Sequence, residues 1–170
     1  MVYANTCAEW MTSAIAAFKH SLAVVTIYTN LGEEGVEHGL MQTQAAIIVT
    51  SHDLLPRLTK VPITSHNMQL SECLLTALVM TLQVLPRCPS ARHVVIIPGH
   101  KPSAAPEPVA EVTFQPLEAV LARGRGRGRD TSTVAGAGAA PSPATTAIIM
   151  YTSGSTGVPK VTWKPYSTFK

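Results

Sequence analysis

The 170-residue chain has few aromatic and few charged residues, which make up 5% and 14% of the sequence. Four of its 13 Lys and Arg residues lie in one Arg-Gly tract at 123–129, so the net charge of +3 does not indicate a general basic surface. The three cysteines are far apart and form no CxxC pair. This argues against a disulfide framework and a zinc site, and it favours a reducing compartment.

The chain also lacks a long apolar run. The most apolar stretch, residues 70–85, contains polar and acidic side chains and is too short to span a bilayer comfortably. Residues 1–5 lack the charged start and the apolar run of a signal peptide. We therefore expect no membrane anchor in this chain. The six histidines are scattered without an HExxH pattern, so no metal site is expected.

Short β-branched runs alternate with segments of helical spacing. Buried strands are predicted at 22–28, 45–50, 93–98 and 147–151. Helices are predicted at 7–19, from residue 33 onward, and after 51–53, where Ser51 or Asp53 could provide a cap. This alternation is typical of an α/β fold, here an incomplete parallel sheet with flanking helices.

Residues 98–143 differ in character from the segments around them. The stretch is rich in Pro, Gly, Ala, Ser and Thr, and it contains the Arg-Gly tract. We expect it to be largely a flexible linker, interrupted by a brief helix-like segment at 113–121. The tract resembles segments that bind RNA or acidic surfaces, but it lacks interleaved aromatic residues, so a solvated insertion is the favoured interpretation.

A loop rich in Gly, Ser and Thr directly follows the predicted strand at 147–151. Glycines let the backbone approach a ligand closely, and successive amides with hydroxyls and a lysine suit phosphate oxygens. The loop is not a Walker A motif, because two residues separate the lysine from the preceding glycine. The candidate phosphate-binding residues are Thr152, Ser153, Gly154, Ser155, Thr156, Gly157 and Lys160. From composition alone, a purely structural loop remains an alternative.

The string YTSGSTGVPK at 151–160 resembles the phosphate-binding signature TSGSTGxPK of the acyl-adenylate-forming, AMP-binding enzymes. The segments ANTCAEWM at 4–11 and AVVTIYTNLGEEGVEHGLMQTQAAIIVTS at 23–51 resemble long-chain acyl-CoA synthetases. The resemblance implies a fragment of the large N-terminal domain of such an enzyme, with a partial AMP-binding domain at 3–160. Residues 61–83 are expected to be an insertion foreign to the family, and 161–170 a foreign tail.

The resemblance also implies a function, that of a long-chain-fatty-acid–CoA ligase. Such an enzyme converts ATP, a long-chain fatty acid and CoA into acyl-CoA, AMP and pyrophosphate, with Mg2+ accompanying ATP. Relatives work at the cytoplasmic side of the endoplasmic reticulum, the mitochondrial outer membrane or lipid droplets. Contact with a membrane surface would come from regions outside this chain. The chain would carry the phosphate loop without the rest of the site, so we assign it no catalytic residue and expect it to be inactive alone.

Alternative readings involve the loop, the Arg-Gly tract and one acidic group. The chain could be a nucleotide-binding regulatory fragment or an Arg-Gly interaction protein, although a nucleic-acid partner is not expected. An acid/base or metal role is conceivable for Glu33, Glu34, Glu37 and His38. A solvated helix start matched to the helix dipole is the favoured account of this group.

Overall fold

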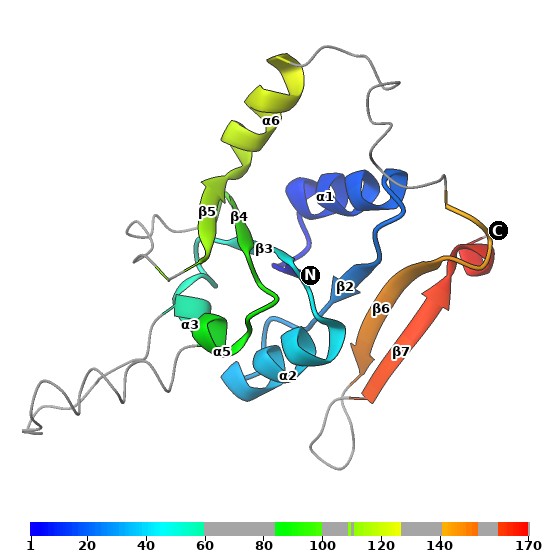
Figure 1. Ribbon diagram of the computed structural model, residues 1–170, viewed down its shortest axis with the longest axis horizontal. Coiled ribbons are helices and arrows are strands. Elements are labelled where there is room, and N and C mark those ends of the chain that lie inside the picture. The colour runs from blue at the N-terminus through cyan, green and yellow to red at the C-terminus, as the bar shows by residue number, and fades with distance from the viewer. Residues whose placement is uncertain (60–83, 100–108, 110, 127–140, 153–159, 170) are drawn as a thin grey trace, which may run out of the picture.

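The computed structural model describes residues 1–59, 84–99, 109, 111–126, 141–152 and 160–169. These residues form a seven-stranded sheet with helices on both faces (Figure 1). The strands are β1 (Val2–Tyr3), β2 (Val24–Thr26), β3 (Ile47–Ser51), β4 (His93–Ile97), β5 (Thr113–Pro116), β6 (Thr146–Thr152) and β7 (Lys160–Pro165). The helices are α1 (Ala8–Lys19), α2 (Glu33–Thr43), α3 (Pro56–Thr59), α5 (Val84–Arg87), α6 (Leu117–Gly126) and the 3-10 helix η2 (Tyr166–Phe169).

The strand order is β5-β4-β3-β1-β2-β6-β7. Every neighbouring pair from β5 to β6 is parallel, and only β7 runs antiparallel to its neighbour β6 in the described sheet. The predicted α/β class is therefore confirmed, with four of the strands at the predicted positions. β7 was not predicted. It occupies the first part of the segment at 161–170 that we expected to be a foreign tail.

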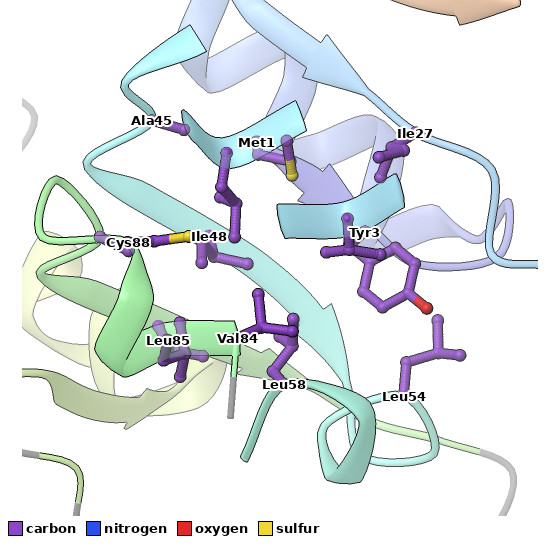
Figure 2. Packing of buried hydrophobic residues seen from close by; sticks show 14 of the residues in the cluster. Met1, Tyr3, Ile27, Ala45, Ile48, Leu54, Leu58, Val84, Leu85 and Cys88 are labelled. Atoms are coloured by element: carbon purple, nitrogen blue, oxygen red, sulfur yellow. The ribbon is translucent and has the colours of Figure 1, made fainter. Parts of the chain in front are cut away.

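Both faces of the sheet are buried, which is why the central strands are apolar in consecutive positions. Successive side chains of β1 point to opposite faces: Tyr3 joins one core cluster and Val2 the other. The first cluster lies under α2, α3 and α5, and Figure 2 shows Ile48, Leu58 and Leu85 among its members. The second cluster lies under α1 and α6.

The ends of the two longer helices follow local chemistry. α1 begins at Cys7, whose Sγ accepts a hydrogen bond from the backbone N–H of Trp10 at 3.4 Å. α2 begins after Gly32 and ends at Thr43, and the following residue, Gln44, adopts a left-handed conformation with φ 53°. No described helix is long and apolar enough to cross a bilayer.

Two stretches differ from the sequence-based expectation. The predicted helix-like segment at 113–121 is helical only over 117–121, where α6 begins, and its first four residues form the strand β5. α6 continues to Gly126 and includes Arg123 and Arg125, so the first part of the Arg-Gly tract is helical and not linker. The expected insertion at 61–83 and most of the remaining expected linker lie outside the described residues.

The N-terminal amine is buried at the start of β1. It donates a hydrogen bond to the backbone oxygen of Ile47 at 2.6 Å, and burial lowers its pKa from the ordinary 8.0 to about 5. Above pH 8 the amine is neutral in both folded and unfolded chains. As the pH falls toward 5, the unfolded chain takes up a proton that the folded chain does not, so the free energy of unfolding decreases.

We therefore predict that the free energy of unfolding of a chain beginning at Met1 falls by about 2 kcal/mol between pH 8 and pH 6 because of this amine. Urea denaturation at the two pH values measures the change. The control is the same chain with an acetylated amine, which lacks the titrating group and should lose this component of the decrease. An identical decrease in both chains would contradict the prediction.

Cys88 is fully buried, and its pKa is raised to about 11, mainly by burial and also by the nearby Glu37. In a Cys73→Ser background, we predict that Cys88 reacts with an aromatic disulfide reagent at pH 8 at least about 100-fold more slowly than the partly exposed Cys7. Stopped-flow absorbance measures both rates. In denaturant the two rates should converge, whereas equal rates in the native protein would refute the burial of Cys88.

Candidate functional site

The candidate loop starts at the edge of the sheet where parallel strands present their carboxyl ends. β6 is parallel to β2 and ends at Thr152, and the chain returns as β7 at Lys160. The Cα atoms of Thr152 and Lys160 are direct partners in the antiparallel β6–β7 pair. The two ends of the predicted loop are therefore held side by side at the carboxyl edge.

Two of the seven predicted site residues, Thr152 and Lys160, belong to the described residues. The other five, Ser153, Gly154, Ser155, Thr156 and Gly157, lie outside them. The side chain of Lys160 is exposed. The structure thus brings together the two ends of the motif, and the direction of its central residues stays a prediction.

Tyr151, directly before the loop, is fixed by helix α2. Its ring is 2% exposed, and its hydroxyl donates a hydrogen bond to Oε1 of Gln42 at 2.8 Å. The ring of His38, one helical turn before Gln42, meets the Tyr151 ring edge-on with centroids 6.5 Å apart. Burial raises the pKa of the Tyr151 hydroxyl, which therefore stays protonated as a donor. These contacts with α2 therefore fix the position of Tyr151, the residue from which the chain enters the loop.

Gly39 allows α2 to approach this point closely. A Cβ at position 39 would lie 3.0 Å from Cδ1 of Ile27 and 3.6 Å from the ring of Tyr151. A side chain here would first crowd the side-chain ends of Ile27 and Met1, the latter at 3.2 Å, while its contact with Tyr151 would be an ordinary one. The face of α2 formed by His38, Gly39 and Gln42 therefore supports the start of the loop at Tyr151.

Polar contacts tie together the segments that follow the central strands. Oγ1 of Thr29, after β2, donates to Oδ1 of Asn5, after β1, at 2.9 Å. Nη1 of Arg57 in α3 donates to the backbone oxygen of Thr29 at 2.6 Å. These bonds fix the carboxyl ends of three strands relative to one another, next to the place where β6 ends.

A pocket of about 240 Å³ opens at this edge beside the loop base. Met150 and Tyr151 form one side of the pocket, and Trp10 and Thr26 contribute to the rest. The pocket is small and mixed in polarity, so it suits a small group and not a long acyl chain. The described part of the site is therefore a small pocket beside the two ends of the predicted phosphate loop.

Two members of the group Glu33, Glu34, Glu37 and His38 contact different parts of the fold. Glu37 makes an ion pair with Arg87, with Oε2 and Nη2 2.8 Å apart, and His38 packs on Tyr151. Among the described residues, no three His, Cys, Asp or Glu side chains lie close enough to hold a metal ion. Glu37 thus joins α2 to α5, where the sequence analysis expected a solvated face.

The support of Tyr151 by α2 was not predicted. The sequence offers one signal for it: His38 and Gln42 are four residues apart and so share one face of a helix. It does not reveal that their partner is Tyr151, 109 positions away from Gln42 in the chain.

The fold and the loop together define the class of the protein. Its architecture matches that of adenylate-forming domains of known structure, and the loop ends lie at the carboxyl edge of the sheet. The model of the AMP-binding enzyme family matches residues 1–162. The chain belongs to the AMP-binding enzyme family.

Relatives with curated functions are similar over short stretches. Long-chain-fatty-acid–CoA ligase 1 of Saccharomyces cerevisiae is 42% identical over 59 residues, which are 35% of this chain and 8% of the yeast protein. Long chain acyl-CoA synthetase 8 of Arabidopsis thaliana is 32% identical over 60 residues, again 35% of this chain and 8% of the relative. The aligned stretches thus span less than a tenth of these relatives.

Solved structures share the fold over almost the whole chain. The anthranilate CoA ligase AuaEII in complex with anthranoyl-AMP aligns with a TM-score of 0.57 and 18% identity, over 99% of this chain and 25% of its own. The A domain of the carboxylic acid reductase from Segniliparus rugosus aligns with a TM-score of 0.63 and 17% identity, over 98% of this chain and 24% of its own. The chain therefore spans about a quarter of these structures.

We predict that Tyr151→Phe lowers the free energy of unfolding by about 1 kcal/mol, because the hydrogen bond to Gln42 is lost. Chemical denaturation measures the change. The matched control is Tyr28→Phe, since Tyr28 is 53% exposed and its substitution should change stability by less than about 0.5 kcal/mol. Equal effects of the two substitutions would mean that the bond does not anchor the loop base.

Proposed function

We propose that this chain carries the triphosphate-binding loop of a long-chain-fatty-acid–CoA ligase. The main supporting observation is the pairing of Thr152 with Lys160, which fixes both ends of the TSGSTGVPK motif at the carboxyl edge of a parallel sheet. Ligands of open α/β sheets bind at this edge. The identity of the curated relatives, several of them long-chain-fatty-acid–CoA ligases, supports the choice of substrate class.

Each part of the loop has a role in this proposal. The backbone amides and hydroxyls from Thr152 to Gly157 would donate hydrogen bonds to phosphate oxygens, and the glycines would allow close approach. Lys160, exposed at the start of β7, would add a positive charge. Such groups stabilise the negative charge that develops when a carboxylate attacks the α-phosphate and pyrophosphate leaves. Mg2+ bound with ATP would neutralise further phosphate charge.

The complete enzyme would convert ATP, a long-chain fatty acid and CoA into acyl-CoA, AMP and pyrophosphate. In this chain the small pocket beside Tyr151 offers no room for a long acyl chain. We therefore propose that the 170-residue chain binds the nucleotide but does not form acyl-CoA alone.

We predict that Lys160→Ala weakens binding of a non-hydrolysable ATP analogue with Mg2+ about tenfold, because one charge-assisted contact is lost. Isothermal titration calorimetry measures the affinity. Lys164→Ala is the matched control: Lys164 is also exposed on β7, but it pairs with Ile148, away from the loop, and its substitution should change affinity less than about twofold. Gly154→Val should abolish binding. Equal effects of the two lysine substitutions would refute the assignment.

A further inference from the structure

A second pocket, of about 220 Å³, lies at the same edge of the sheet but away from the phosphate loop. Its walls come from the segments that follow β1, β3 and β4, and none of its lining residues belongs to β6 or β7. It adjoins the first pocket, with which it shares Asn5 and Thr6, but of the two pockets only this one is lined by Ser51, Asp53 and the end of β4.

The topology explains why a pocket opens there. In the sheet order β5-β4-β3-β1-β2, β1 and β3 are neighbours. The connection after β1 leads to β2 on one side of this pair, and the connection after β3 leads to β4 on the other side. α1, after β1, packs on the face of Val2, whereas α3, after β3, packs on the face of Tyr3. The connections therefore diverge between β1 and β3, and such a switch point is where doubly wound sheets bind ligands.

The start of helix α1 forms one wall of the pocket. Thr6, Cys7 and Glu9 line it, and α1 is 12 residues long. The helix therefore directs the positive end of its dipole and its first amides toward this space. A helix start suits any ligand atom that accepts hydrogen bonds, so it does not by itself identify the ligand.

Ser51 supplies an independent sign of a ligand. It lines the pocket at the end of β3 and is only 6% exposed. Its Oγ has no hydrogen-bond partner among the described residues. Buried hydroxyls are nearly always hydrogen-bonded, so this hydroxyl favours a polar ligand group in the pocket as its partner.

Two carboxylates restrict the chemistry of that group. Asp53 and Glu9 both line the pocket, and the Asp53 carboxylate lies so close to Gly99 that any Cβ at position 99 would overlap it. Carboxylates accept hydrogen bonds and repel anions, which argues against a phosphate at this position. A metal ion is not favoured either, because no three His, Cys, Asp or Glu side chains of the described residues lie close enough to hold one. A neutral ligand with several hydroxyl groups suits both the carboxylates and the helix start. Each hydroxyl can donate a hydrogen bond to a carboxylate and accept one from an amide or from Ser51.

We propose that the pocket between β1, β3 and β4 binds a small neutral molecule with adjacent hydroxyl groups, such as a pentose. The adjacent hydroxyls donate to the Asp53 carboxylate and exchange hydrogen bonds with Ser51, while ring or hydroxyl oxygens accept from the first turn of α1.

An NMR titration of the full 15N-labelled chain with D-ribose tests this site. We expect millimolar binding, with amide shifts concentrated at Ala8, Glu9 and Ser51. The related 2-deoxyribose, which lacks the C2 hydroxyl and so has fewer pairs of adjacent hydroxyls, should bind at least about threefold more weakly. Equal shifts with both sugars, or no shift with ribose, would overturn the proposal. Shifts at these amides with inorganic phosphate but not with ribose would identify an anion site and overturn it as well.

Substitutions of pocket residues test whether ribose binds in this pocket. We expect Ser51→Ala to weaken ribose binding about threefold and Asp53→Asn about tenfold, with folding checked by the dispersion of the remaining spectrum. Thr162→Ala, which changes an exposed hydroxyl on β7, is the control and should have no effect. Unchanged ribose affinity in both pocket variants would overturn the assignment. Ribose carries no phosphate, so Lys160→Ala should leave its binding intact, and this result separates the pocket from the proposed phosphate loop.

Discussion

Parallel pairing of β1 with both β2 and β3 is the constraint on which the rest of the structure depends. β1 contains two residues, yet it joins the half of the sheet that ends in β5 to the half that ends in β7. Because the paired strands run in the same direction, their following segments meet at one edge, where Asn5, Thr29 and Arg57 are hydrogen-bonded. The loop ends and both pockets are located at that edge for this reason.

The sequence predicted four of the strands that are buried on both sides, and it missed β1, which has only two residues. β2, β3, β4 and β6 have a pattern of consecutive apolar residues, and all four lie where they were expected. β5 and β7 lack it: β5 is half-buried and ends in Pro116, and Trp163 on β7 is 62% exposed. Their strand conformation comes from pairing with a neighbour and not from their own composition, so periodicity does not reveal them.

The candidate site was predictable in part for a similar reason. The motif at 151–160 is local, so its residues could be read directly from the sequence, and the family membership agrees with that reading. What holds the motif in place is not local. Tyr151 depends on Gln42 and His38, and the second pocket depends on Ser51 and Asp53 meeting the start of α1. Such contacts arise from the topology, which no short stretch of sequence contains.

The position of β6 beside β2 has a consequence for how the chain reaches its native state. Thr26 donates a hydrogen bond to the backbone of Ile149, 123 positions later. At a synthesis rate of roughly 5–20 residues per second, β2 is made roughly 6–25 seconds before its partner strand β6. Contacts of such long sequence separation also slow folding, because loop closure comes before the pairing that compensates for it. Chaperone protection of the nascent β2 edge would therefore matter most during this interval.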